Sequence, residues 1–569
     1  MHSLRVLLPT LFVLFGAVGA AKSADSIDAV LHLVPSDTTI CLIVRDAGQH
    51  LKTIGESPMA EWFLKSSVGK QLADPNELDK LKVAEQFLTT QLGVTSEQVR
   101  DAVLGDAIVL AYQPGAAGKP DSETGIIFIK PRSMDVLQQL IDGVNKLQLQ
   151  DNEIRPVKEL SHRGQRYYVR EKVAGGREFY RVHDGIFAFS SREQAIHGII
   201  DQSLIPLTDK PSGIAARLLE LGVSKKMAVC LFNPRGFDAE LVTKTDGSKD
   251  ANEKAFLTQF RKVWTATTSF AISIHPTKEL EVGLVASFNR DVLPKELHPF
   301  LFPTDSASKL WNAVPNAALF AVGGRVNANH VRDALATFLP AGGKEGLANA
   351  LEQGVGPAVG RDKLALVLNG LGPDWVFWLE PPVKSNWAPA WTFALQLNSG
   401  DKPADLSRAV LQGLDFLGQF VRFTYNRTHT DQIDATETVK SDLVVKLLAN
   451  PVAFPSGFTP SYAVKDHHLL IASSEDRIRS FTPPTATKPD APLIRIAAQN
   501  IQSYLKQHKP DVAKVLATAS NRPHKDVDRE LGDIVALLEL FDRVELKQSR
   551  TKNRVELTLQ FQFIKPLAK

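Results

Sequence analysis

The strongest constraint on the fold of this 569-residue chain is a set of paired segments that recur in the same order along its two halves. The first pair joins PSDTTICLIVRDA, beginning at Pro35, to PNAALFAVGGRVNA, beginning at Pro315, so that Arg45 corresponds to Arg325 without a gap. Each segment reads as a proline-led turn, an apolar strand and the start of a helix. Because a fixed repeat length is the sequence signature of a repeated architecture, this pair predicts two copies of one folding unit.

Four further pairs of segments support the same division. LGDAIVLAYQP is matched by LGPDWVFWLEP, and each is followed by a strand, a proline-bearing turn and an amphipathic helix. A strand that ends in two serines follows in both halves, as GIFAFSS and then as LLIASS. Each half closes with two strands in which apolar and polar residues alternate, which is the pattern of a half-buried antiparallel sheet. The sequence therefore predicts two units of about 270 residues each.

The local patterns predict the fold class. Strands joined by tight turns, as in QRYYVREKVAGGREFYRVHDGIFAFSS, indicate antiparallel hairpins, whereas other strands are separated by helices. This mixture favours an α+β fold with antiparallel or mixed sheets and flanking helices over a doubly wound parallel sheet. We expect a first α+β unit at residues 22–302 and a second at 303–569, with inner boundaries near 205–213 and 481–492, where Pro, Thr and Asp gather.

The first 21 residues have the composition of a secretory signal peptide. Arg5 precedes an apolar run from Val6 to Val18, and small residues suited to cleavage follow. An uncleaved anchor is the alternative. Since no later apolar run approaches the ~20 residues of a membrane span, we expect no integral span after cleavage. These features predict a periplasmic or extracellular protein.

Composition and cysteine count narrow the possible functions. The chain is 44% hydrophobic and 23% charged with a formal net charge of +3, which is typical of a globular protein and argues against a nucleic-acid partner. The only cysteines are Cys41 and Cys230, so a disulfide-rich scaffold is excluded. They are interpreted either as two buried thiols or as one disulfide between neighbouring strands.

The double serines raise the question of a catalytic nucleophile. A nucleophile elbow needs Gly-x-Ser-x-Gly, which the chain lacks. The alternative is helix capping: Ser190 and Glu193 fit a Ser-x-x-Glu capping box, and Ser473 with Asp476 gives a weaker version of it. We therefore predict structural caps and no catalytic residue. The pair His467-His468 lacks the further ligands of a zinc site, so neither a metal nor another cofactor is expected.

Two clusters are candidate ligand surfaces. Aromatic platforms line many carbohydrate sites, and four of the seven tryptophans lie close together at Trp375, Trp378, Trp387 and Trp391. Interleaved basic and aromatic residues can bind a polyanion or a glycan, and the first half offers such a segment with Arg166, Arg170, Arg177 and Arg181. The alternative interpretations are core packing for the tryptophans and the solvated face of a sheet for the arginines.

The signal peptide together with PSDTTICLIVR, GDAIVLAYQP and GIFAFSSRE resembles a family of large exported bacterial proteins described only as a domain of unknown function. The resemblance implies a duplicated α+β module and a location in the envelope or outside the cell. It transfers no catalytic residues.

Three functional hypotheses follow. The first is a non-enzymatic exported protein that binds a ligand or organises the envelope, with an envelope glycan or another exported protein as its partner. The second is a hydrolase with a cleft between the two units. The third is a glycan or polyanion binder that uses the tryptophan cluster or the arginine-rich segment.

Overall fold

The computed structural model describes residues 24–65, 75–115, 122–207, 211–302, 307–382, 387–398, 400–455, 457–484 and 490–565. The predicted signal peptide, residues 1–21, lies outside this part of the chain, as do portions of the two expected inner boundaries. The chain divides into two compact units. Unit 1 comprises Met1–Asp246, Trp264–Asn289 and Gln560–Lys569, and unit 2 comprises Gly247–Val263 and Arg290–Leu559.

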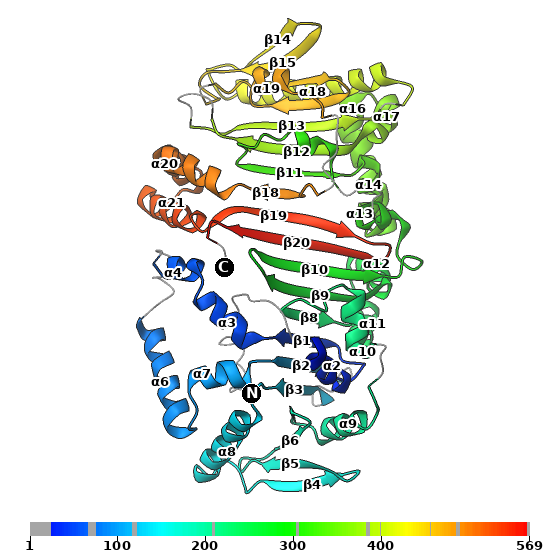
Figure 1. Cartoon of the computed structure of the whole chain (residues 1–569). Helices are drawn as coiled ribbons and strands as arrows, with labels where there is room; N and C mark the ends of the chain where they lie inside the picture. The colour runs from blue at the N-terminus through cyan, green and yellow to red at the C-terminus, as the bar shows by residue number, and fades with distance from the viewer. Residues whose placement is uncertain are drawn as a thin grey trace. The chain divides into compact units, whose positions relative to one another are not determined.

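The fold is α+β, as the sequence predicts, and neighbouring strands are antiparallel (Figure 1). The strands of unit 1 pair in the order β4–β5–β6–β7–β3–β2–β1–β8–β9–β10. They are β1 (Ile40–Arg45), β2 (Ala107–Gln113), β3 (Thr124–Lys130), β4 (Lys158–His162), β5 (Gln165–Glu171), β6 (Arg177–His183), β7 (Ile186–Ser190), β8 (Ala228–Phe232), β9 (Thr267–Pro276) and β10 (Leu280–Phe288).

The strands of the second half pair in the order β14–β15–β16–β17–β13–β12–β11–β18–β19–β20, which is the order of the first ten strands with each number raised by ten. They are β11 (Phe320–Arg325), β12 (Leu371–Glu380), β13 (Ala390–Leu397), β14 (Asp434–Lys440), β15 (Leu443–Ala449), β16 (Ser461–Lys465), β17 (His468–Ala472), β18 (Ile494–Ile496), β19 (Phe541–Arg550) and β20 (Arg554–Phe563).

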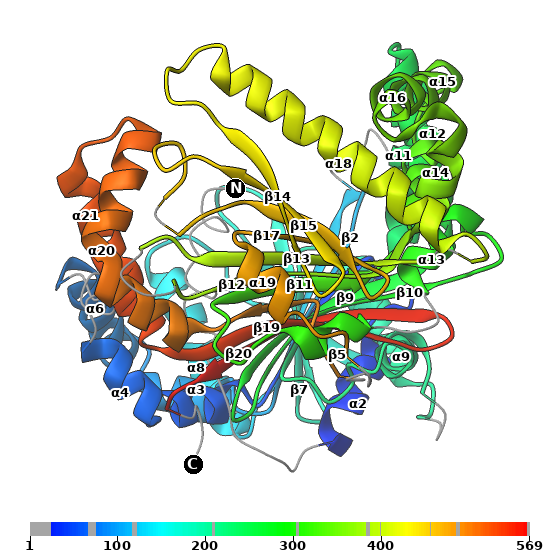
Figure 2. The same ribbon diagram turned by 90° about the horizontal axis from the view of Figure 1, so that it is seen from above.

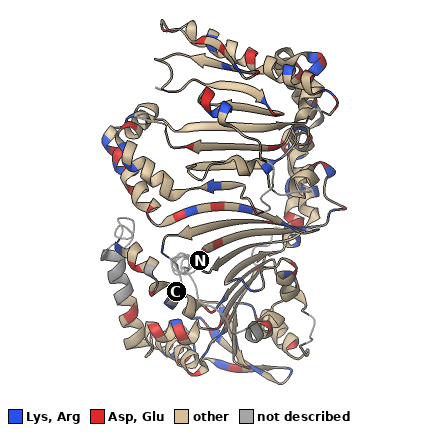
Figure 3. Cartoon of the chain, turned by 45° about the horizontal axis from the view of Figure 1, so that its top comes forward, with Lys and Arg blue, Asp and Glu red and all other residues tan. Residues whose placement is uncertain are grey.

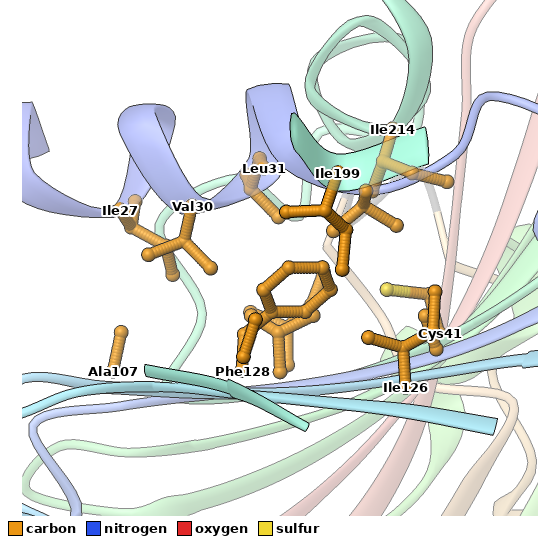
Figure 4. Close-up of a cluster of buried hydrophobic side chains, with 14 of the residues drawn as sticks. Ile27, Val30, Leu31, Cys41, Ala107, Ile126, Phe128, Ile199 and Ile214 are labelled. Carbon is orange, nitrogen blue, oxygen red and sulfur yellow. The ribbon is translucent and has the colours of Figure 1, made fainter. Parts of the chain in front are cut away.

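One face of the unit 1 sheet packs under three helices. These are α2 (Ala24–Leu33), α9 (Glu193–Ser203) and α10 (Gly213–Glu220), which contact one another through α2. Phe128 points from its strand into this layer and is fully buried, with Val30, Ile199 and Ile214 above it (Figure 4), and Ile43 is a fully buried member of the same cluster. This main core is where the apolar stripes of the helices are removed from water.

The other face of the unit 1 sheet is covered by helices only in part. Ala47, in α3 (Ala47–Gly55), packs with Val44 and Ile108, and Leu104 follows the π-helical turn η1 (Val99–Val103) to complete the cluster. The helix α8 (Met134–Gln150) packs on η1. Three helices precede η1 along the chain: α4 (Pro58–Lys65), α6 (Pro75–Gln91) and α7 (Ser96–Gln98). The remainder of this face carries the candidate site.

Unit 2 has its main core between the sheet and two short helices. Leu310 and Trp311 of η5 (Lys309–Ala313) and Ile478 of α19 (Glu475–Ser480) pack on Val376, Ala394 and Leu470. The opposite face packs on α16 (Gly356–Val359), α17 (Leu364–Gly370) and α18 (Pro403–Asn426). The other long helices are α14 (Ala328–Thr337), α15 (Ala341–Ala350), α20 (Ala498–Ser520) and α21 (His524–Leu538).

Among the residues that the structure describes, no helix combines the length and the apolar character needed to cross a bilayer.

Candidate functional site

A row of apolar side chains crosses the partly covered face of unit 1, one residue from each strand. Strand register places each member directly opposite the next, from Phe189 through Ile127, Leu110 and Leu42 to Cys230, and on to Ile272 and Leu284. We call this row the open stripe: Phe189, Ile127, Leu110, Leu42, Cys230, Ile272 and Leu284. Its seven strands at about 4.8 Å spacing make it roughly 29 Å long.

Three of the seven side chains in the open stripe are exposed, and the other four, Phe189, Leu110, Leu42 and Cys230, are half-buried. Ile272 and Leu284 are 47% and 45% exposed, and Ile127 is 37% exposed. On the opposite face of the same strands, Ser273 and Ser287 are only 2% and 3% exposed. The sequence alternation correctly predicts that β9 and β10 are half-buried. On β9 the large apolar side chains do not form the buried half, because the face that packs in the main core carries Ser269, Ala271 and Ser273.

Covered residues border the open stripe on both sides. Toward one end of the strands, Val44 and Ile108 lie under Ala47 of α3. Toward the other end, Phe232 and Phe270 stack with centroids 4.5 Å apart, and they meet Trp264 of α12 (Ala251–Ala266) at 5.9 Å from Phe232. Since side chains on one face of a strand repeat every two residues, the exposed strip is about one row, or roughly 7 Å, wide.

The open stripe continues into a pocket through two tyrosines. Tyr180 lies directly opposite Phe189, and Tyr168 lies opposite Tyr180 with the two rings stacked at 5.0 Å. Both tyrosines line a pocket of about 620 Å³ between α8 and the β4–β6 strands, which we call the α8 pocket. Its other lining residues are Gln138, Asp142, Asn145, Lys146, Leu149, Ile154, Arg155, Pro156, Val157, Glu159 and Val182.

The α8 pocket is lined by both apolar and polar side chains. The amide of Asn145 donates to the hydroxyl of Tyr180 at 3.4 Å. The rim carries two carboxylates, Asp142 and Glu159, and two cations, Lys146 and Arg155, so the formal charges cancel. Figure 3 shows the same interspersed charges along α8 and the neighbouring strands. Such a lining suits a neutral or zwitterionic group that offers both donors and acceptors.

Local sequence positions α8 over the sheet. The hydroxyl of Ser133 accepts from the backbone N–H of Val136 and so caps the first turn. Gly143 lets the helix approach closely, because a Cβ there would lie 3.3 Å from the backbone of Leu92. Leu137 is buried beneath the helix. The helix is therefore held by its cap and its packing, and its polar side forms the pocket wall.

The four arginines proposed as a polyanion surface occupy different environments. Arg181 is 3% exposed, and its guanidinium donates to Ser203 Oγ at 2.9 Å and to Gln165 Oε1 at 3.2 Å. Arg170 is paired with Glu178 at 3.0 Å, and Arg166 with Glu159 at 3.4 Å. Arg177 is exposed and lies opposite Glu171 in the β5–β6 hairpin. Neighbouring carboxylates therefore offset much of the positive charge that a polyanion would need.

The four tryptophans do not share one surface. Trp378 is 4% exposed in the main core of unit 2, where its indole N–H donates to Glu380 Oε2 at 2.9 Å. Trp375 and Trp391 lie half-buried on the opposite face of β12 and β13. The carbonyl of Trp387, before β13, accepts from the hydroxyl of Tyr504 at 2.8 Å. Core packing therefore accounts for at least one of them, and the rest are dispersed.

The prediction of capping boxes is wrong. α9 begins at Glu193, its N-cap is Arg192, and no side chain caps it, so Ser190 stands too early. Ser190 instead ends β7 and donates to the carbonyl of Gly125 at 2.8 Å. Glu193 accepts from the hydroxyl of Tyr167 at 2.8 Å.

The second double serine behaves in the same way. Ser474, with no side-chain cap bond, is the N-cap of α19, so Ser473 and Asp476 form no box. The hydroxyl of Ser473 accepts from the backbone N–H of Trp391 at 3.1 Å. Each serine thus joins the end of one strand to the start of its neighbour.

The cysteines form no disulfide. Both thiols are free, and Cys41 lies opposite Leu231 whereas Cys230 lies opposite Leu42. A shift of one residue puts the two side chains on opposite faces of the sheet. Cys41 is therefore in the main core, where burial raises the pKa of its thiol to about 12, and Cys230 is in the open stripe.

Hydrogen bonds lower the pKa of two carboxyl groups, Asp101 and Glu475. A hydrogen bond from Arg100 lowers the pKa of Asp101, and one from Thr438 lowers that of Glu475, whereas a general acid needs a raised pKa. Within the described residues, no group of three or more His, Cys, Asp or Glu side chains could hold a metal ion.

No known protein family, curated protein or solved structure matches the chain. Ile127, Ile272 and Leu284 are therefore assigned to a site on geometry alone. Sequence reasoning missed them because an exposed apolar row and a buried one have the same alternation. The sequence does carry one indication of the exposed row. Serines occupy the opposite face of the same strands, at Ser269, Ser273 and Ser287, and serine is uncommon in a core unless small side chains are required there.

Proposed function

We propose that this chain is an exported, non-enzymatic binding protein whose unit 1 holds the apolar chain of an amphiphilic ligand along the open stripe. The observation that carries the proposal is the reversed exposure on β9, where Ile272 is 47% exposed and the adjacent Ser273 is 2% exposed. Contiguous exposed apolar surface costs free energy in water, at roughly 25 cal/mol per Å², so a ligand that covers it binds favourably.

The dimensions of the open stripe favour an acyl chain over a protein partner. A strip about one residue row wide is too narrow for a protein interface, which buries about 800 Å² per partner. One leaflet of a bilayer contributes about half of the roughly 30 Å hydrocarbon core, so an acyl chain is about half as long as the open stripe and fits within it. The α8 pocket, to which strand register connects the stripe through the buried Tyr180, would receive the polar headgroup.

The neutral balance of the α8 pocket supports an uncharged or zwitterionic headgroup, such as a sugar. On this proposal a glycan would form the headgroup, and the envelope would be the source of the ligand. Export rests on the signal-peptide pattern of residues 1–21 and on the resemblance to an exported family. The hydrolase hypothesis gains no support from the carboxyl pKa values described above.

We also propose that the two halves arose by duplication of one module. The support is the shared order of strand pairing together with the five segment pairs in the sequence. The row of unit 2 that follows the corresponding strands contains Tyr462, Ile471, Phe393, Phe377 and Val322, all half-buried. On the matching strands of unit 1, Phe189, Leu110 and Leu42 are half-buried too, whereas Ile127 is exposed. We assign ligand binding to unit 1 because Ile272 and Leu284 of the same row are also exposed there.

The proposed function is tested by titrating the full chain with 1-N-phenylnaphthylamine and with a fluorescent fatty acid. We expect saturable binding that Ile272→Lys weakens about tenfold or more, because burying a chain against an ammonium group is unfavourable. Leu219→Lys, which alters a residue that is 59% exposed on α10, is the matched control and should bind like the wild type. Absence of saturable binding, or equal loss in the control, contradicts the proposal.

A further inference from the structure

The second half of α18 in unit 2 carries an apolar face that nothing in the described residues covers. Five of its side chains are about half exposed or more: Phe416 48%, Leu417 55%, Phe420 61%, Val421 48% and Phe423 66%. They recur at spacings of three and four residues, so they lie on one side of the helix. Isolated exposed apolar residues are ordinary, but a contiguous group of this size marks an interaction surface.

This face continues the side of α18 that is buried in its first half. Leu406, Ala409 and Val410 pack into the cluster formed with α16 and α17. Gly413 allows α16 to approach closely, since a Cβ there would lie 2.9 Å from Val359. One turn later the same side of the helix extends beyond α16, as Figure 2 shows for the yellow helix α18.

The second half of α18 is held in place by its other side. Asp415 accepts from the hydroxyl of Tyr462 at 2.8 Å and pairs with Lys446 of β15. At the helix end, the hydroxyl of Tyr425 donates to Asp431 at 2.7 Å. The apolar face is therefore presented outward on a fixed support, because the bonds that hold the helix lie on its polar side.

Two exposed charges on the second half of α18 are positive, whereas the exposed charges of the adjacent β14–β15 hairpin are mixed. Arg422 and Arg427 are exposed, and no carboxylate of the described residues pairs with either of them. The two carboxylates of the helix are already engaged, Asp405 with Arg408 at 3.6 Å and Asp415 with Lys446. Phenylalanines and leucine beside unpaired arginines on one helix are the composition of a helix that lies in the interface of an anionic bilayer.

The adjacent β14–β15 hairpin extends the apolar surface. Val439 and Val444 lie directly opposite each other in the hairpin and are 66% and 41% exposed. α18 contacts β14, and the exposed Lys440 follows Val439. We propose that the second half of α18, with this hairpin, docks unit 2 onto the surface of a membrane rich in anionic lipid. The inference is independent of the ligand site in unit 1.

The test is flotation of the full chain with vesicles of phosphatidylcholine alone and with added phosphatidylglycerol. We expect the wild type to float with the anionic vesicles. For the double variant Phe420→Asp with Phe423→Asp, the fraction of protein that floats should be lower by about tenfold or more. Arg422→Glu with Arg427→Glu should lose the preference for phosphatidylglycerol and its sensitivity to salt. Val515→Asp with Leu516→Asp, on α20 and 40% and 45% exposed, is the matched control and should behave like the wild type.

Three results would overturn the proposal: no flotation of the wild type, equal flotation of the Phe420 and Phe423 variant, or a dimer in light scattering that this variant dissociates. The last result would make the face an interface between two copies of the chain. Binding of 1-N-phenylnaphthylamine by the same variant should stay unchanged, which separates failure of membrane docking from failure of the ligand site.

Discussion

Cys230 of β8 lies directly opposite Ile272 of β9, in the middle of the open stripe, while Cys41 faces the main core from the other side of the sheet. The reactivity of each thiol therefore depends on the accessibility of one face of the sheet. Cys230 is half-buried, whereas Cys41 is 1% exposed. Protection of Cys230 from a thiol reagent can therefore detect a ligand in the open stripe without any substitution in the site.

We predict that a maleimide alkylates Cys230 and spares Cys41 in the native chain at pH 8.5. Burial raises the pKa of Cys41 to about 12, which leaves very little thiolate at that pH, and burial raises the pKa of Cys230 as well, so its labelling is slow but measurable. A fatty acid should slow labelling of Cys230 several-fold, as followed by mass spectrometry. Equal labelling rates with and without the ligand would argue against occupancy of the open stripe.

The different burial of two adjacent apolar side chains on β10 predicts opposite outcomes for their substitution. Leu284→Ser alters a side chain that is 45% exposed, so the free energy of unfolding should change by less than about 1 kcal/mol. Val285→Ser alters a side chain that is 1% exposed in the main core and should cost about 2 to 4 kcal/mol. Denaturant unfolding measures this free energy for both variants. A larger loss for Leu284→Ser than for Val285→Ser would show that the open stripe belongs to the hydrophobic core.

The hydroxyl of Ser190 is predicted to stabilise the join between β7 and β3. Ser190→Ala removes its bond to the carbonyl of Gly125 at a buried position, so we expect a loss of about 1 to 2 kcal/mol in denaturant melts. Ser191→Ala, at the exposed neighbour, is the control and should cost less than about 0.5 kcal/mol. A similar loss in both variants would contradict this assignment.

Tyr167 predicts a loss of stability in alkali. Burial and the hydrogen bond to Glu193 raise the pKa of its hydroxyl to about 12, compared with about 10 in the unfolded chain. As the pH rises, the hydroxyl of Tyr167 therefore loses its proton in the unfolded chain before it does so in the folded chain. The stability that the protonated hydroxyl contributes is complete below pH 10 and is lost as the pH rises toward 12. We expect Tyr167→Phe to be less stable at pH 8 by about 1 to 2 kcal/mol and to lose less stability between pH 10 and 12. Parallel pH profiles of the two proteins would refute this account.

The sequence predicts much of the fold because local patterns specify local elements. The hairpin turns at Gly175 and Gly185 require positive φ, which glycine adopts without strain, and the β5–β7 meander forms as expected. The alternation in residues 267–288 correctly predicts the β9–β10 hairpin. The double serines were misassigned because a strand end and a helix cap favour the same residue types within two positions of each other.

The candidate site could not be predicted in the same way. Trp375 and Trp378 are close in sequence, but their positions on a strand send them to opposite faces. The arginines of the β4–β6 segment meet carboxylates from neighbouring strands and from α9, and only the tertiary pairing shows this neutralisation. The α8 pocket joins a helix and three strands, which no single segment reveals.

The sequence by itself determined many of the elements of this protein and its α+β class, because backbone propensity and side-chain period act within a few residues. Which face of each strand is left open was decided only by the tertiary structure. The period of two distinguishes the faces of β9 but does not say which one the helices cover. Helix packing buried Ser273 and exposed Ile272, since burial depends on what lies above a side chain and not on its own polarity.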